Sequence, residues 1–314
     1  MKRQPTTLAK LTRPKLFRVV ARDRLFRLLD EERLGRSVVW IAGPPGAGKT
    51  ALTASYLEAR KLPTIWYQVD GGDADPATFF HYLALAGRRA AGRKRLRLPV
   101  LTPEFASDLP GFTRRFFREL FTGLRTTTTL VLDNYQEVIS ESTFHSVIQG
   151  AVVELPAGIN LIVISHIPPP PQYARALANN LIAHIDWDEL RLTLEETTAI
   201  AGAVQGPTDE TLLHSLQNQT NGWVAGLILM LDRFKATGLV NHSSQSETME
   251  SVFRYFAGQM FAQATEELRE FLIRTAILPR MTVRMAMEIS ANPQASELLD
   301  DLYRRRLFTD RRAG

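Results

Sequence analysis

Residues 43–50 carry the most specific chemical pattern of the chain, Gly-Pro-Pro-Gly-Ala-Gly-Lys-Thr. It fits the phosphate-loop pattern G-x-x-x-x-G-K-[ST], in which glycines let successive backbone N–H groups turn toward phosphate oxygens. In such a loop Lys49 reaches the β- and γ-phosphates of a nucleotide, and the Thr50 hydroxyl holds Mg²⁺. The sequence therefore predicts binding of ATP or ADP with Mg²⁺. The predicted contact residues are Gly43, Pro44, Pro45, Gly46, Ala47, Gly48, Lys49, Thr50 and Ala51.

The segments that flank this loop fit the pattern. Residues 37–42 form an apolar, β-rich run directly before the loop, and residues 50–60 directly after it favour a helix. The start of that helix would direct the positive end of its dipole toward the same phosphate. The alternative is a chance glycine-rich turn, and the strand, loop and helix in succession argue against it.

A second candidate residue ends another apolar run, Leu130-Val-Leu-Asp133. Asp133 would complete the Mg²⁺ shell opposite Thr50. Apolar runs that end in aspartate are common, so this assignment depends on the phosphate loop earlier in the chain. The long separation leaves room for a strand and helices in between. It predicts the P-loop subclass in which an extra strand lies between the phosphate-loop strand and the Asp133 strand.

The next candidate strand, residues 160–165, ends at His166. In the predicted subclass this strand lies between the other two, so its end faces the γ-phosphate. We expect His166 to sense the γ-phosphate by donating a hydrogen bond and to titrate near neutrality. The alternative is a histidine that contacts only water or backbone.

Hydrolysis needs a group that activates the attacking water. Many such enzymes have a second acid directly after the first, and here that residue is Asn134. An amide can orient water but cannot accept its proton. Glu137 is near, but the sequence does not fix where its side chain points. We therefore expect slow hydrolysis at best. The groups expected to act at the γ-phosphate are Lys49, Asp133, Asn134 and His166.

The order of apolar runs predicts an α/β fold with a five-stranded parallel sheet. Runs that are apolar on both faces, as in buried parallel strands, alternate with helical patterns over the first 190 residues. Beyond residue 191 the strand patterns stop and short helices follow. The predicted domains are a P-loop domain (1–190), a helical domain (191–245) and a third module (246–314), which we expect to continue. The expected strands are 38–42, 64–69, 129–132, 160–165 and 181–185.

Finer features are expected after residue 191. Thr193 and Glu196 are spaced as a capping box at a helix start. Further helices are expected at 209–219 and 223–236, the latter ending at Gly238. Polar residues at 240–247 favour a linker.

Composition restricts the possible class and partners. The chain has no cysteine, which excludes disulfides, thiolate metal sites and cysteine nucleophiles. No apolar run approaches the roughly 20 residues of a membrane helix, and no signal-peptide core follows the N-terminus. We therefore expect a cytoplasmic protein with no membrane partner.

The net charge is +5, and residues 87–98 hold six cations without an acid or an aromatic residue. That segment is expected to be a solvated helix end or loop, with nucleic-acid contact as the alternative.

In order and spacing these patterns resemble the STAND class of signalling ATPases. The similarity is to the N-terminal ATPase region of the MalT-like branch of large LuxR-type transcriptional regulators. It implies that the third module (246–314) is winged-helix-like. It also implies arginines near the base and ribose of the nucleotide, with Arg22 as the candidate. The family usually has an acid at the position of Asn134 and an arginine at that of His166, so this chain departs from it at the γ-phosphate end. The segments that carry the resemblance are 11–15, 20–25, 66–76, 132–136, 164–166, 190–193, 221–226 and 266–308.

The resemblance implies an ATP- and ADP-binding module of a bacterial transcriptional regulator. It would act as a nucleotide-gated switch that self-associates in the ATP state, with slow or no hydrolysis. The family's sensor repeat and DNA-binding domain are not in these residues, so DNA contact is expected only through domains outside this chain. One alternative is an AAA-type DNA-processing ATPase, of the origin-binding or loader kind, with residues 88–97 and the winged helix on DNA. Another is a scaffold that holds ADP without turnover, which Asn134 and His166 favour.

Overall fold

The computed structural model describes residues 8–92, 96–138, 142–237, 261, 264–278 and 281–304. The chain divides into two compact units, one of Met1–Gly43 with Gly48–Leu190 and the other of Pro44–Ala47 with Arg191–Gly314. Some expectations fall outside the described residues: the basic residues 93–95, the helix end at Gly238, the linker 240–247 and the end of the third module after residue 304.

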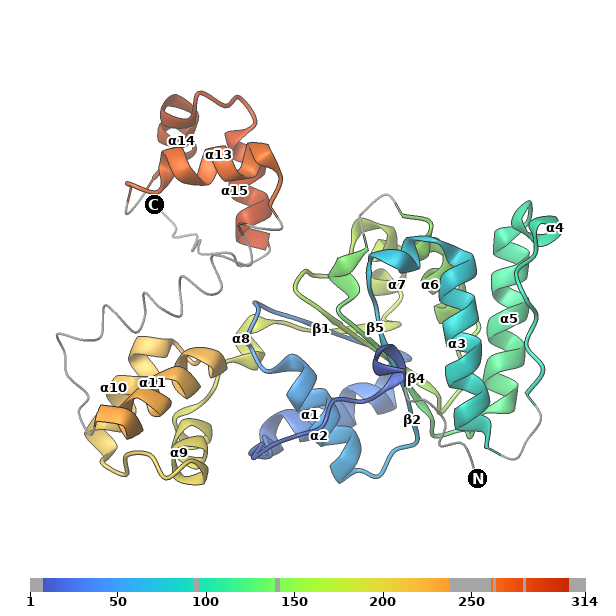
Figure 1. Cartoon of the computed structure of the whole chain (residues 1–314), viewed down its shortest axis with the longest axis horizontal. Helices are drawn as coiled ribbons and strands as arrows, with labels where there is room; N and C mark the ends of the chain where they lie inside the picture. Colours follow the sequence, from blue (N-terminus) through green and yellow to red (C-terminus); the bar gives the residue numbers. More distant parts are fainter. Residues whose placement is uncertain are drawn as a thin grey trace. The chain divides into compact units, whose positions relative to one another are not determined.

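The first unit is built on a parallel sheet (Figure 1). The sheet has five strands in the order β2-β3-β4-β1-β5. In β4, Ser165 pairs with Ala42 of β1, and in β2, Gln68 pairs with Asp133 of β3. The carboxyl ends of the strands therefore share one edge, with β4 between β1 and β3. The predicted α/β fold and its inserted strand are confirmed. The strands are β1 (Val38–Ala42), β2 (Thr64–Gln68), β3 (Thr129–Asp133), β4 (Asn160–Ser165) and β5 (Ile182–Ile185).

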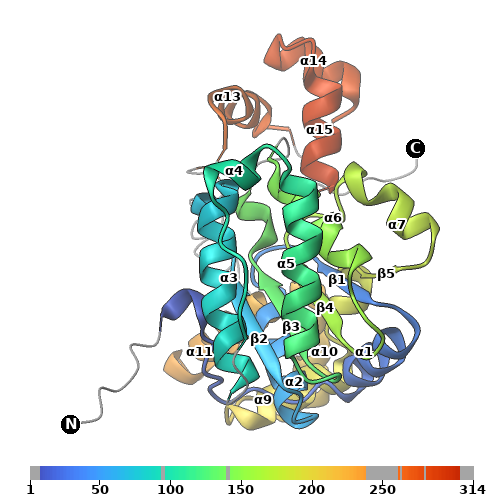
Figure 2. The ribbon, with the colours of Figure 1, turned by 90° about the vertical axis from the view of Figure 1, so that its right-hand side faces the viewer.

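Helices cover both faces of this sheet. The crossover from β1 to β2 runs along the sheet in the opposite direction from the later crossovers. Right-handed connections therefore place α2 on one face and α3, α5 and α6 on the other. The views show α1 and α2 on one side of the strands and α3 beside α5 on the other (Figures 1 and 2). The longer helices are α1 (Asp23–Gly35), α2 (Lys49–Ala59), α3 (Pro76–Ala91), α5 (Leu109–Gly123) and α6 (Phe144–Val153).

Side chains of β1 alternate between the two faces of the sheet, so this strand packs against the helices on both faces. Val38 and Trp40 join one large core with the aromatic residues of α3 and α5. Val39 and Ile41, also buried, point to the opposite face because successive strand residues alternate. On α5, Phe116 and its aromatic neighbours Phe112, Phe117 and Phe121 are buried in this core. Short elements complete the unit: α4 (Pro103–Ala106), α7 (Ala174–Ala178), α8 (Trp187–Leu190), and 3-10 turns at Ala9–Leu11, Gly71–Ala74, Tyr135–Glu137 (η3) and Pro171–Tyr173.

From Arg191 on, the secondary structure of the second unit is helical over its described residues. One apolar core joins α9 (Leu194–Ala203), α10 (Glu210–Thr220) and α11 (Val224–Thr237). The predicted capping box opens α9, with Glu196 N donating to Thr193 Oγ1 and Thr193 N donating to the Glu196 carboxylate. A second core joins α13 (Glu266–Thr275), α14 (Val283–Ser290) and α15 (Ala295–Arg304). Over the described residues no helix is both long enough and apolar enough to cross a membrane.

Candidate functional site

The phosphate loop joins β1 to α2. Gly46 (φ 73°) and Gly48 (φ 80°) have left-handed backbone conformations, which glycine adopts without a Cβ penalty. The start of the loop is fixed to the neighbouring strand, because Gly43 N donates to the carbonyl of Ser165 (3.3 Å). At its other end, the first-turn N–H groups of α2 have no carbonyl one turn earlier in the helix. They belong to Lys49, Thr50 and Ala51, and such a set of donors suits an anion.

Lys49 is the buried cation of this loop. Its side chain is only 6% exposed, and Nζ donates to the carbonyl of Gly43 (2.7 Å). Burial lowers the pKa of Lys49 to about 7, and the charge of Asp133 partly opposes that shift. Desolvation thus disfavours the charged amine here, so a phosphate beside it would stabilise the cation.

The two predicted metal ligands meet in the structure. Thr50 Oγ1 donates to Asp133 Oδ1 (3.0 Å), and so does the backbone N–H of Asn134 (3.0 Å). Asp133 is 3% exposed, and burial raises the pKa of its carboxyl group. A hydroxyl and a carboxylate at this separation are hard oxygen donors of the kind that Mg²⁺ takes, so the residues fit that ion.

Asn134 has a left-handed backbone (φ 62°, ψ 42°) and precedes the η3 turn. Asparagine tolerates this conformation better than most residues. The turn is anchored from inside by Tyr135, whose hydroxyl contacts His145 Nδ1 (2.8 Å) and the Tyr173 hydroxyl (2.6 Å). This buried polar network fixes the backbone directly after Asp133. Sequence reasoning missed it, because nothing local relates three polar rings in separate apolar segments.

His166 follows β4, and its backbone N–H donates to Gln136 Oε1 (3.1 Å). That contact ties the end of β4 to the turn after β3. Burial, together with the charge of Lys49, lowers the pKa of His166 to about 3. The expectation that His166 titrates near neutrality is therefore wrong for this structure, since desolvation keeps the imidazole neutral. Its hydrogen bond to a γ-phosphate stays a prediction.

Acid is expected to destabilise the folded chain through His166. Its pKa in the folded state lies below the ordinary value of 6.5, so between pH 6.5 and about pH 3 the unfolded chain binds more protons. The free energy of unfolding should then fall as the pH falls, by at most about 3 kcal/mol between pH 6.5 and 4.5. Urea unfolding at both pH values measures it. His166→Gln should flatten the dependence, and His214→Gln, at an exposed position, should not. An equal slope in His166→Gln and the parent chain would contradict this.

Arg22 lies at the start of α1 and contacts the end of α8. It stands at the N-cap of α1, is 6% exposed, and donates from Nη2 to the carbonyl of Leu190 (2.9 Å). Arg24 Nη2 donates to the adjacent carbonyl of Glu189 (2.8 Å). The two arginines thus bind carbonyls at the end of α8, where cations are favourable. The contact of Arg22 with a base or ribose stays a prediction.

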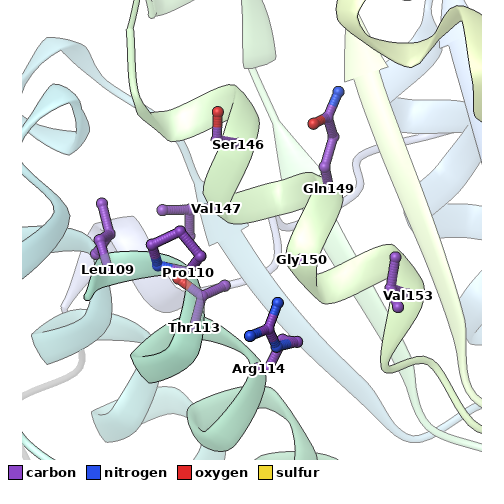
Figure 3. A pocket seen from close by; sticks show the side chains of 9 residues that line it. All are labelled: Leu109, Pro110, Thr113, Arg114, Ser146, Val147, Gln149, Gly150 and Val153. Carbon is purple, nitrogen blue, oxygen red and sulfur yellow. The ribbon is translucent and has the colours of Figure 1, made fainter.

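A hollow of about 310 Å³ lies between α5 and α6 (Figure 3). Leu109 and Arg114 line it from α5, and Val147 and Gln149 line it from α6. Its walls are mostly apolar and come from the outer helices rather than from the phosphate loop. None of the predicted site residues lines this hollow.

The chain is similar to known regulators over nearly its whole length. It is 26% identical over 311 residues to the HTH-type transcriptional regulator MalT of Vibrio cholerae, covering 96% of this chain and 34% of that protein. MalT of Cronobacter sakazakii is 25% identical over 278 residues, with 86% and 30% covered. The chain thus spans about a third of the length of these relatives. Residues 257–314 also match the family model of the MalT winged helix domain.

Solved structures show the same fold. A Walker-type ATPase of Pyrococcus abyssi matches with a TM-score of 0.62 at 14% identity, covering 93% of this chain and 91% of that one. The ORC1 protein of Aeropyrum pernix, solved in complex with DNA, matches with a TM-score of 0.51 at 13% identity, covering 93% and 85%. At such identities the likeness concerns the fold alone. Together, these matches confirm the resemblance to a MalT-like STAND ATPase and its winged-helix segment.

Proposed function

We propose that this chain, which resembles MalT-like STAND ATPases, is the ATP- and ADP-binding switch module of a bacterial transcriptional regulator that acts in the cytoplasm. The observation that carries the proposal is the contact of Thr50 with Asp133, next to the buried Lys49. This contact places the predicted phosphate-binding residues beside the predicted metal ligand Asp133. We also propose the three-module layout of residues 1–190, 191–245 and 246–314.

Each residue has a definite part in this proposal. Lys49 and the first-turn N–H groups of α2 bind phosphate oxygens. Thr50 and Asp133 would hold Mg²⁺, which supplies charge neutralisation at the phosphates. His166, as a neutral imidazole, donates to the γ-phosphate, and Asn134 orients water without taking its proton. The arrangement favours retention of the nucleotide over its consumption.

A switch requires that ATP and ADP favour different states. We propose that the ATP state self-associates and that DNA is contacted only through domains outside this chain. The test is titration calorimetry with ATP and with ADP, with and without Mg²⁺, followed by light scattering in each nucleotide. We expect both nucleotides to bind, Mg²⁺ to strengthen ATP binding, and the mass to be larger in ATP. Failure to bind either nucleotide would overturn the site, and equal masses would overturn the switch.

A further inference from the structure

Two N–H groups at the start of α11 donate to two successive carbonyl groups of the phosphate loop. The indole Nε1 of Trp223 donates to the carbonyl of Pro45 (2.9 Å), and the backbone N–H of Ala225 donates to that of Gly46 (3.0 Å). We call this pair of hydrogen bonds the loop clamp. Consistently, Pro44–Ala47 belong to the same compact unit as the helices after Arg191.

The local sequence around Trp223 is suited to placing the indole. Gly222 has φ 75°, and a Cβ there would lie 2.8 Å from the backbone N of Leu192, which itself donates to the Gly222 carbonyl (2.9 Å). A Cβ on Gly226 would lie 2.8 Å from Cε3 of Trp223, so the indole rests against the helix at that glycine. Both glycines are therefore required, one by the turn and the other by the ring.

The loop clamp affects the phosphate site because each clamped carbonyl belongs to a peptide group whose N–H also lies in the phosphate loop. In a planar trans peptide the C=O and the N–H point in opposite directions. The carbonyl of Pro45 shares its peptide with the N–H of Gly46, and the carbonyl of Gly46 shares its peptide with the N–H of Ala47. Holding the two carbonyls thus fixes where both N–H groups point. The Ala47 N–H also donates to Pro44 O within the loop (3.2 Å).

The clamp also satisfies groups that would otherwise lack partners. Ala225 is the second residue of α11, and first-turn N–H groups have no acceptor within their own helix. The outward carbonyls of a phosphate loop likewise need donors from elsewhere. The start of α11 thus supplies N–H donors, and the phosphate loop supplies carbonyl acceptors. Their pairing favours one conformation of the loop.

We propose that Trp223 and Ala225 are positioning residues for the phosphate site. They hold the peptide that carries the Gly46 N–H in the orientation that receives phosphate, and they hold the peptide that carries the Ala47 N–H in the loop turn closed on Pro44. The helical region after Arg191 thereby sets nucleotide affinity. This inference rests on the proposed nucleotide binding and adds to it two residues outside the phosphate-loop pattern. Because linkage is reciprocal, bound nucleotide must also strengthen the clamp.

Two substitutions each delete one donor. Trp223→Phe keeps an aromatic ring at Gly226 and removes the indole N–H. Ala225→Pro removes the backbone N–H at the second residue of a helix, a position that proline already occupies in α5 as Pro110. Ala225→Gly is the matched control, because it changes the side chain and keeps the amide.

The full chain is titrated with ATP and ADP, and thermal unfolding of each variant is recorded. We expect Trp223→Phe and Ala225→Pro each to bind roughly two- to tenfold more weakly, and Ala225→Gly to bind like the parent. Donor deletions that lower only the unfolding temperature, with parental affinity, would show a purely structural role and overturn the inference. A parent chain that binds no nucleotide would instead overturn the proposed function.

Hydrogen exchange of the Ala225 amide tests the clamp directly. We expect this amide to exchange slowly in the parent chain, more slowly still with ATP, and faster in Trp223→Phe. An amide that exchanges as fast as an open first-turn N–H would overturn the inference. So would protection that ATP leaves unchanged in a chain that binds it.

Discussion

Replacing Lys49 with alanine is expected to weaken the binding of ATP and ADP by roughly 30- to 5,000-fold, about 2–5 kcal/mol. The side chain is 6% exposed and bonded to the carbonyl of Gly43, so it is already held within the loop. Its charge acts in a desolvated site, where interaction with phosphate is strong. Calorimetric titration of the variant and the parent chain measures the ratio.

The unfolding temperature of Lys49→Ala distinguishes a loss of nucleotide affinity from misfolding of the variant. Burial lowers the pKa of Lys49, so the lost hydration of this cation costs the folded chain free energy that the charge of Asp133 only partly returns. The unfolding temperature of Lys49→Ala, measured without nucleotide, should therefore match or exceed that of the parent. Lys235→Ala removes the same charge at an exposed position in the last turn of α11 and should leave affinity unchanged. Parental affinity in Lys49→Ala would refute the site assignment.

The sheet could be predicted because each of its strands is specified by consecutive residues in the sequence. Each of the five strands is short and apolar on both faces, and the predicted ends differ from the observed ones by at most one residue. For example, β2 ends at Gln68 rather than Val69, and β5 begins at Ile182 rather than Leu181. The phosphate loop could be predicted for the same reason, since its glycines and Lys49 are consecutive in the sequence.

Contacts between distant residues could not be predicted in this way. The resemblance includes residues 221–226 but gives Trp223 no role. The hydrogen bond from the Trp223 indole to the Pro45 carbonyl depends on tertiary structure. The neutral state of His166 depends on burial, which residue type does not give. The direction of Glu137 was open, and the structure shows it exposed and accepting a hydrogen bond from Gln136 Nε2 (3.3 Å). Such features arise where segments far apart in sequence meet.

Asn134→Asp is expected to raise steady-state phosphate release from ATP by roughly 10- to 100-fold. The position directly follows Asp133, and a carboxylate there could accept the proton of the attacking water, which an amide cannot. This expected increase lies at or below the lower end of the usual range for general-base catalysis, because His166 remains neutral in place of a cation. Phosphate release at saturating ATP and Mg²⁺ measures the change.

The backbone makes this substitution informative. Asn134 has φ 62°, a conformation that aspartate also tolerates, so the variant should fold as the parent does. Asn134→Gly keeps that backbone without a side chain and should release phosphate no faster than the parent. If Asn134→Asp also leaves the rate unchanged while binding ATP normally, the missing carboxylate does not limit turnover. Phosphate release that is undetectable in both chains would instead favour the alternative of a scaffold that holds ADP without turnover.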